Sequence, residues 1–126
     1  GRRKDYAARY ADELCVIVQL ETEAAIDAAG EIAAVPGVDG VFIGPNDLAA
    51  SMGSLGAMHS EPVVAAIARG LADIRAEGKA AGILDFNPDS AAARFEAGFG
   101  FVAAGGDGFA LARSLDALVT HFRKDR

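Results

Sequence analysis

Four short apolar runs alternate along the chain with segments that have helical spacing. The runs do not alternate apolar with polar residues, which is typical of strands buried on both faces. We therefore predict four strands, at Leu14–Leu20, Gly40–Ile43, Ala80–Leu84 and Gly100–Ala104.

The segments between the apolar runs predict helices. One of them ends before Pro36-Gly37, a helix-ending signal. Another opens with Ser60 as N-cap and a proline in its first turn, has apolar residues three or four apart, and stops at Gly78. The predicted helices are Thr22–Ala34, Ser60–Glu77, Pro88–Ala97 and Phe109–Phe122.

Strand–helix alternation repeated four times predicts an α/β fold with a parallel sheet. Two architectures fit this pattern. One is an open doubly wound sheet, and the other is half of a (β/α)₈ barrel, whose full length is typically about 250 residues. The spacing alone does not choose between them. In both, the loops after the carboxyl ends of the strands are where chemistry is expected.

Composition and charge narrow the class of protein. The 126 residues correspond to a single domain, and the absence of an initiating Met is expected of a fragment. The net charge is −6, and basic residues cluster only at the two chain ends, which argues against nucleic-acid binding. No apolar run reaches about 18 residues, so no membrane span is expected. Cys15, the single cysteine, is expected to be buried, and a reducing, cytoplasmic location follows.

Two acidic residues lie where chemistry is expected. Glu21 follows the first predicted strand directly, and Asp47 lies just past the second. If these strands are adjacent and parallel, they lie about 4.8 Å apart and both carboxylates emerge at the same edge. One or two carboxylates, with water or substrate in the other positions, are how Mg²⁺ is usually held. The alternative is structural, because an acid near a helix start also favours the helix dipole or caps the helix.

Neighbouring residues add weaker signals. Gln19 lies two residues before Glu21, on the same side of its strand, and needs a hydrogen-bond partner in so apolar a run, either a buried residue of the same layer or a bound substrate oxygen. After Gly44-Pro45, the amides of Asn46, Asp47 and Leu48 are expected to be free donors at a helix start, suited to a carboxylate or phosphate. The alternative is an ordinary strand-to-helix turn.

The two histidines and the glycine-rich turn are weaker candidates for a functional site. His59 is expected in a loop and His121 near the end of the last helix, and neither belongs to a triad pattern. Residues 105–108 (GGDG) could form an anion-binding turn, but they lack the spacing of a dinucleotide fingerprint.

Several of these segments, taken in order, resemble the HpcH/HpaI aldolase family. They are residues 18–22 (VQLET), 37–48 (GVDGVFIGPNDL), 51–53 (SMG), 59–62 (HSEP), 78–84 (GKAAGIL) and 102–107 (VAAGGD). The resemblance covers nearly the whole chain and is nearer to the pyruvate aldolase branch than to the citrate lyase β-subunit branch. It implies the C-terminal half of a TIM (β/α)₈ barrel and a class II aldolase that uses Mg²⁺, Mn²⁺ or Co²⁺.

The resemblance also assigns residues. Glu21 and Asp47 match metal ligands, and Gln19 and Leu84 match substrate-facing positions. The amides around Asn46 and Asp47 match the cradle for the pyruvate carboxylate. The family's catalytic base belongs to the first half of the barrel, so no catalytic residue is assigned here and the 126 residues alone are not expected to be active.

The function implied is a lyase that joins pyruvate to an aldehyde, or cleaves 4-hydroxy-2-oxo acids or 2-keto-3-deoxy sugar acids. A citrate lyase β-subunit-like or malyl-CoA-type thioester lyase is the first alternative. A non-catalytic fragment that only supplies subunit contacts is the second. The last predicted helix carries more apolar residues than a lone edge helix needs, and in the resembled family this helix packs against a neighbouring subunit, so a homo-oligomer is implied.

Overall fold

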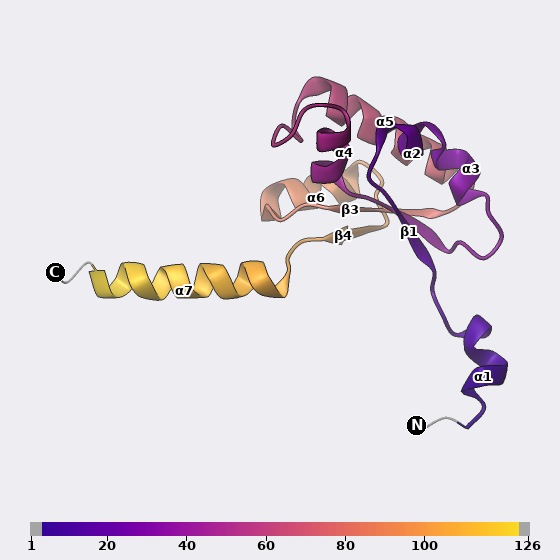
Figure 1. Cartoon of the computed structure of the whole chain (residues 1–126), viewed down its shortest axis with the longest axis horizontal. Coiled ribbons are helices and arrows are strands. Elements are labelled where there is room, and N and C mark those ends of the chain that lie inside the picture. The colour runs from indigo at the N-terminus through magenta and orange to yellow at the C-terminus, as the bar shows by residue number, and fades with distance from the viewer. Residues whose placement is uncertain (1–3, 124–126) are drawn as a thin grey trace.

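A single parallel sheet organises the computed structural model, which describes residues 4–123. Within this range the strand order is β1-β2-β3-β4, and every strand pairs in parallel with the next (Figure 1). An open doubly wound sheet reverses its strand order at a switch point. The sequential order therefore excludes that alternative and agrees with half of a (β/α)₈ barrel. The strands are β1 (Ile17–Leu20), β2 (Gly40–Ile43), β3 (Ala80–Leu84) and β4 (Phe101–Ala103).

The four predicted helical segments are helical, and short helices at Tyr6–Arg9, Tyr10–Asp12 and Pro45–Ser51 occur in addition to them. The predicted helix Thr22–Ala34 is two short helices with a break at Ala28, a position that neither Gly nor Pro marks in the sequence. The basic clusters at the chain ends lie largely outside the described residues. The helices are α1 (Tyr6–Arg9), the 3₁₀ turn η1 (Tyr10–Asp12), α2 (Glu23–Asp27), α3 (Ala29–Ala33), α4 (Pro45–Ser51), α5 (Glu61–Ala76), α6 (Pro88–Glu96) and α7 (Asp107–Arg123).

The core lies between one face of the sheet and α5. This helix packs against β2 and β3 and also contacts α2, α3 and α4 (Figure 1). Gly70 lets it approach closely, because a Cβ there would lie 3.1 Å from Ile26 Cδ1 and 3.3 Å from Ile43 Cδ1. The fully buried aliphatic residues of this core include Leu20, Ile26, Val41, Ile43, Leu48, Val63, Ile74 and Ile83.

The opposite face of the sheet carries a different row of side chains. Gln19, Phe42, Gly82 and Phe101 are paired across the four strands. The Phe101 ring lies over Gly82, where any Cβ would collide with it, and its centroid is 5.9 Å from that of Phe42. Gln19 and Ile17 are exposed and every residue of β4 is only half-buried, so the prediction that every strand is buried on both faces is wrong for β1 and β4. Among residues 4–123, no helix covers that face (Figure 1).

The start of β1 also differs from the prediction. The strand begins at Ile17, so the apolar residues Leu14, Cys15 and Val16 precede it and are exposed. Cys15 was expected to be a buried core residue, and this expectation is wrong because the sheet does not extend to it. The segment is held instead by the Val16 amide, which donates to Asp39 Oδ2 at 2.7 Å.

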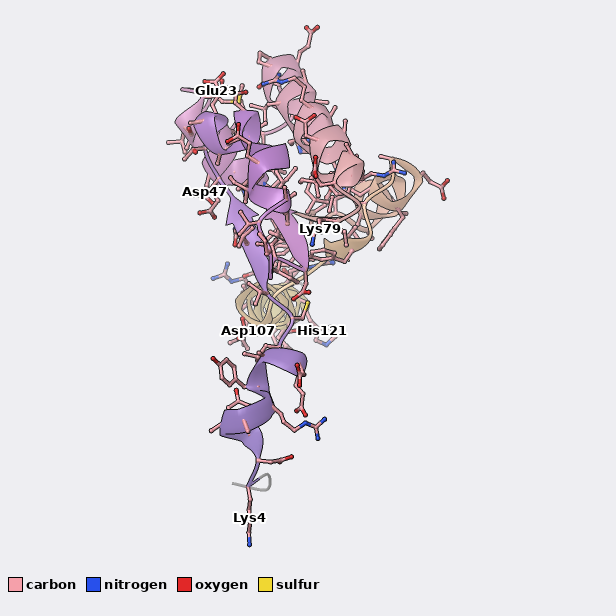
Figure 2. All side chains as sticks on the ribbon, turned by 90° about the vertical axis from the view of Figure 1, so that its right-hand side faces the viewer. Lys4, Glu23, Asp47, Lys79, Asp107 and His121 are labelled. Atoms are coloured by element: carbon pink, nitrogen blue, oxygen red, sulfur yellow. The ribbon has the colours of Figure 1, made fainter. Side chains whose placement is uncertain are left out.

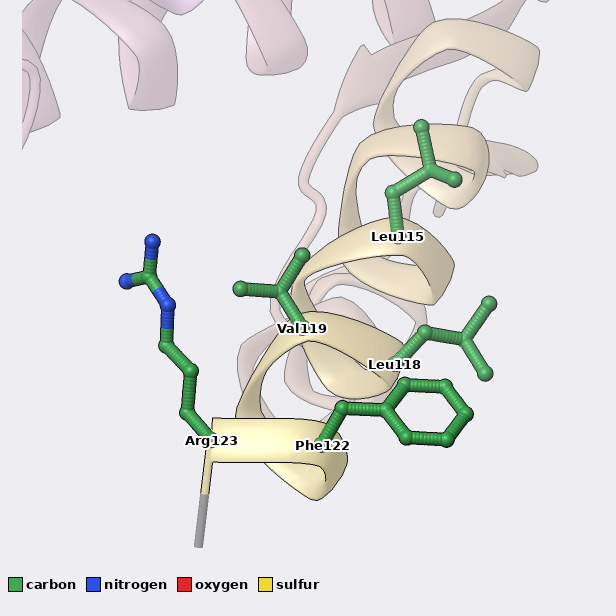
Figure 3. A pocket seen from close by; sticks show the side chains of 5 residues that line it. All are labelled: Leu115, Leu118, Val119, Phe122 and Arg123. Atoms are coloured by element: carbon green, nitrogen blue, oxygen red, sulfur yellow. The ribbon is translucent and has the colours of Figure 1, made fainter. Parts of the chain in front are cut away.

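The last helix, α7, extends away from the sheet (Figure 1). Its predicted apolar stripe is uncovered within the described chain, as expected. Several of these side chains border a hollow of about 420 Å³ along the helix, together with Arg123 (Figure 3). No helix of the described residues is long and apolar enough to cross a membrane. The exposed apolar residues of α7 are Phe109, Leu111, Leu115, Leu118, Val119 and Phe122.

Candidate functional site

The carboxyl ends of β1 and β2 bring the two predicted metal ligands to the same edge of the sheet. Leu20 pairs with Ile43, and the Gly44 amide donates to the Leu20 carbonyl at 3.0 Å. Glu21 directly follows Leu20, and Asp47 lies in the first turn of α4, past the end of β2 (Figure 2). The predicted adjacency of the two strands is therefore confirmed.

Gln19 and Glu21 form a hydrogen-bonded pair. Gln19 Nε2 donates to Glu21 Oε1 at 2.7 Å. Because the two residues are two apart on a strand, their side chains share one face. The partner that the sequence required for Gln19 is thus the carboxylate itself. A charge-assisted bond of this kind fixes the orientation of the acceptor and leaves Glu21 Oε2 for another partner.

Gly44 provides the space for this pair. A Cβ at position 44 would lie 3.1 Å from Gln19 Nε2, 3.1 Å from Glu21 Cγ and 3.2 Å from Glu21 Oε1. Contacts this short are tighter than ordinary van der Waals packing. The backbone at Gly44 has φ −98° and ψ 95°, which other residues also adopt, so the glycine gives room to the neighbouring side chains and is not demanded by the turn.

The capping alternative does not hold for either acid, although Asp47 lies in the first turn of α4, where an acid also favours the helix dipole. The N-cap of α2 is Thr22, whose Oγ1 accepts a bond from the Ala25 amide at 3.1 Å, so Glu21 lies outside that helix. The N-cap of α4 is Gly44, so Asp47 is the third residue of that helix and not its cap. Neither carboxylate is therefore used as a cap.

One expectation about the Gly-Pro turn is wrong. The Leu48 amide donates to the Gly44 carbonyl at 3.0 Å, within the first turn of α4, so it is not a free donor. Asn46 and Asp47 are exposed, and the first amides of a helix have no partner inside it. Any cradle at this turn is therefore limited to those two amides.

The donor set fits a hard divalent cation with open coordination positions. Among residues 4–123, no group of three or more His, Cys, Asp or Glu side chains is arranged to hold a metal. Two carboxylates placed just past the ends of neighbouring strands match the Mg²⁺ pattern, in which water and substrate fill the remaining positions. Leu84, the predicted substrate-lining residue, is half-buried at the end of β3, on the same face as Gly82.

One acidic residue at the end of a strand was not predicted from the sequence as a functional candidate. Asp85 directly follows β3 and is the only buried charged residue in the described part of the chain. Burial opposes its charge, but hydrogen bonds from Ser90, Arg94 and the Asn87 amide together outweigh that effect and lower the pKa of Asp85. The signal was present in the sequence, because Asp85 follows an apolar run just as Glu21 does.

The weaker candidates stay peripheral. His59 is exposed in the loop before α5, and His121 is exposed on α7. Ser60 is the N-cap of α5 as predicted, but its hydroxyl makes no capping bond. In the glycine-rich turn, Asp107 Oδ1 accepts from the Gly108 amide at 2.7 Å, so an acidic side chain already takes up one of the donors.

Comparison with known proteins gives consistent matches. The family model described as HpcH/HpaI aldolase/citrate lyase matches residues 2–114. The hydroxypyruvate/pyruvate aldolase of Agrobacterium fabrum is 48% identical over 119 residues, which are 94% of this chain and 45% of that protein. The 4-hydroxy-2-oxo-heptane-1,7-dioate aldolase of Escherichia coli is 46% identical over 122 residues, 97% of this chain and 47% of that protein. The chain therefore spans about half the length of the curated relatives it matches.

Solved structures agree with the sequence relatives. An HpcH/HpaI aldolase/citrate lyase family protein from Burkholderia cenocepacia superposes with a TM-score of 0.87 at 37% identity, over 98% of this chain and 48% of that one. Macrophomate synthase superposes with a TM-score of 0.80 at 23% identity, over 98% of this chain and 44% of that one, which shows a shared fold alone. The four strand–helix units thus correspond to half of a (β/α)₈ barrel.

Proposed function

The chain belongs to the HpcH/HpaI aldolase/citrate lyase family, and from this premise we propose that it is the C-terminal half of a class II aldolase barrel whose metal is held by Glu21 and Asp47. The observation that carries the proposal is the edge shared by β1 and β2. There Glu21 is oriented by Gln19, Gly44 leaves room for both side chains, and neither acid serves as a helix cap.

The substrate in this proposal is pyruvate together with an aldehyde, or the 4-hydroxy-2-oxo acid or 2-keto-3-deoxy sugar acid that the two form. The proposal is supported by the names of two relatives at 46% and 48% identity, a 4-hydroxy-2-oxo-heptane-1,7-dioate aldolase and a hydroxypyruvate/pyruvate aldolase. The thioester lyase alternative has weaker support, since the CitE structure from Mycobacterium tuberculosis, solved with coenzyme A, is 22% identical and superposes with a TM-score of 0.60.

Each proposed site residue has a distinct task. Glu21 and Asp47 provide the carboxylate ligands for Mg²⁺, Mn²⁺ or Co²⁺. When bound, such an ion supplies Lewis-acid stabilisation of negative charge on a substrate oxygen. Gln19 orients Glu21 and faces the substrate. The amides of Asn46 and Asp47 receive the pyruvate carboxylate, and Leu84 provides an apolar side that excludes water from the reacting carbons.

The proton transfer needs a base that this chain is not proposed to supply. A positioned base typically contributes about 10²–10⁴-fold to such a step. His59 and His121 are both exposed, one in a loop and the other on α7, which extends away from the sheet. Both carboxylates at the site are assigned to the metal. We therefore place the base in the complementary half of the barrel.

The test is exchange of the pyruvate methyl protons in D₂O, followed by proton NMR with Mg²⁺ or Mn²⁺ present. The full-length protein that carries these 126 residues is expected to catalyse the exchange, and chelation by EDTA is expected to stop it. The isolated chain is expected not to catalyse it. A full-length protein without exchange would contradict the aldolase proposal, and an isolated chain as fast as the full protein would place the base within this chain.

The uncovered apolar stripe of α7 supports a homo-oligomer. Past the first turns of α7, the exposed apolar side chains of Leu115, Leu118, Val119 and Phe122 line one hollow and mark a surface for another protein surface to cover. Sedimentation of the full-length protein should show an assembly, and a monomer at all concentrations would contradict this. The proposed location is the cytoplasm, which the single, unpaired Cys15 supports.

A further inference from the structure

Asp85 is a charged residue without access to solvent at the carboxyl end of β3, with 2% of its surface exposed. Its carboxylate accepts three hydrogen bonds, from Ser90 Oγ at 2.7 Å, from Arg94 Nε at 3.0 Å and from the Asn87 amide at 3.2 Å. A buried carboxylate is stable only when it is paired and bonded in this way. All three donors come from the loop and the helix that directly follow β3.

These three bonds tie α6 to the end of β3. Ser90 and Arg94 lie on α6, one turn apart, and the Asn87 side chain caps the same helix by accepting from the Asp89 amide at 3.0 Å. The β3–α6 loop is thereby held at both of its ends. Side chains alternate along an extended segment, so the flanking residues Leu84 and Phe86 are expected on the opposite side of the segment from Asp85.

The Phe86 side chain lies beside the loop that follows β4. Its ring centroid lies 5.1 Å from that of Phe109 in the first turns of α7. A Cβ added at Gly106 would lie 3.7 Å from Phe86 Cζ, in ordinary contact. Beside these residues is a cavity of about 340 Å³, lined by Phe86, Pro88, Phe109, Ala110 and residues 104–106, together with the polar side chains of Arg113 and Ser114.

We propose that Asp85 is a positioning residue which, through Ser90 and Arg94, holds Phe86 as the apolar wall of a subsite for the carbonyl acceptor, in the cavity between the β3–α6 and β4–α7 loops. The inference rests on the proposed aldolase function. It goes beyond that function by adding a subsite on β3 and β4 to the metal and pyruvate site on β1 and β2.

The chemistry of the lining fits the tail of an aldehyde. An aldol reaction needs room for a second substrate beside the pyruvate carbon, and in barrels of this type the loops at the carboxyl ends of the strands provide it. Two aromatic rings favour apolar carbon atoms. The acceptor class is therefore an aldehyde with an aliphatic tail of several carbons, and Phe86 limits the length of that tail.

The test compares two acceptors in the full-length protein with pyruvate and Mn²⁺. The kcat/KM values for pentanal and acetaldehyde are measured for the wild type and for the Phe86→Leu, Asp85→Asn and Arg94→Lys variants, each below its unfolding midpoint. Because one methylene group in an apolar pocket changes discrimination by about tenfold or more, Phe86→Leu and Asp85→Asn are expected to shift the pentanal-to-acetaldehyde ratio in the same direction by about that factor. Arg94→Lys keeps the charge and is expected to shift it less.

Asp89→Asn is the matched control, because Asp89 is an exposed acid in the first turn of α6, four residues from Asp85 in the sequence. It is expected to keep the wild-type ratio. A merely structural role of Asp85 would lower both kcat/KM values by the same factor and leave the ratio unchanged, and that result would overturn the inference. If Asp85→Asn does not fold, an unchanged ratio in Phe86→Leu would overturn it equally. A wild-type protein without pyruvate proton exchange would overturn the proposed function and this inference together.

Discussion

Glu21 and Asp85 each directly follow a parallel strand of the same sheet, yet their surroundings differ. Glu21 is half-buried and accepts a single side-chain bond, from Gln19. Asp85 is buried and accepts three bonds, one of them from the Arg94 guanidinium. A carboxylate with this many partners has little capacity left for a metal, while Glu21 keeps one oxygen available.

The comparison shows that position at a strand end does not by itself give an acid a binding role. What separates the two residues is the number of donors that the fold supplies. At β1 the following helix is capped by the Thr22 hydroxyl, so Glu21 is not used as its cap. At β3 the following helix contributes Ser90 and Arg94, so the acid joins the scaffold. We therefore expect substitution of Glu21 to affect metal binding and substitution of Asp85 to affect stability.

The largest effect is expected for the proposed metal ligands. Loss of a residue that merely supports a metal ligand typically costs about 10–100-fold in metal affinity or activity, so Glu21→Ala or Asp47→Ala in the full-length protein should lower metal-dependent turnover by more than ~100-fold. Glu23→Ala is the matched control, since Glu23 is exposed two residues away (Figure 2). Full activity in either ligand variant, measured at saturating Mn²⁺, would contradict the site assignment.

The next effect concerns stability at the other carboxylate. Asp85→Ala leaves Arg94 without its buried partner, and breaking such a pair costs roughly 3–5 kcal/mol. Because the Arg94 side chain is 21% exposed, the lower end of that range is expected. Thermal and denaturant unfolding of the full-length protein would measure it, with Asp89→Ala as control. A change no larger than that of the control would mean that Asp85 is not a structural residue.

A smaller effect is expected when the space beside Glu21 is filled. Gly44→Ala places a Cβ 3.1 Å from Gln19 Nε2 and Glu21 Cγ, which forces the pair to move. Metal affinity should fall by about 10–100-fold, while the unfolding midpoint stays near the wild-type value. Gly108→Ala is the control, because no atom lies within 4 Å of its added Cβ. Equal metal affinities for the two variants would show that the Gln19–Glu21 arrangement does not matter for binding.

The smallest effect is the pH dependence of the Asp85 contribution. Because its pKa is lowered in the folded protein, Asp85 binds a proton more weakly when folded than when unfolded. Its stabilisation is therefore fully present above the ordinary Asp pKa of about 3.9 and is lost as the pH falls through the folded value. The difference in unfolding free energy between wild type and Asp85→Asn should be constant from pH 7 to about 5 and shrink below about 4. A difference that grows on acidification would contradict this.

The sequence predicted some of these features well. The bounds of β2 and β3 match the prediction, because each is an apolar run bounded by turn residues. The adjacency of β1 and β2 followed from the strand–helix repeat. The start of β1 was predicted too early, since Leu14, Cys15 and Val16 are apolar but lie before the sheet.

Asp85 was missed for a physical reason. Whether an acid after a strand binds a ligand or stabilises the scaffold depends on donors several residues away, here Ser90 and Arg94 on α6. These contacts form only when the helix folds back onto the strand end. In the same way, only the structure shows that Gln19 bonds to Glu21 and that Gly44 makes space for both.

The most direct test of the account is a titration of the full-length protein with Mn²⁺, followed by electron paramagnetic resonance of the free ion. The same titration is carried out on Glu21→Gln, Asp47→Asn and Asp85→Asn, all of which keep the size of the side chain. We expect one tight site in the wild type, loss of that site in Glu21→Gln and Asp47→Asn, and wild-type affinity in folded Asp85→Asn. Unchanged affinity in Glu21→Gln, or loss of the site in Asp85→Asn alone, would contradict the assignment of Glu21 to the metal and Asp85 to the scaffold.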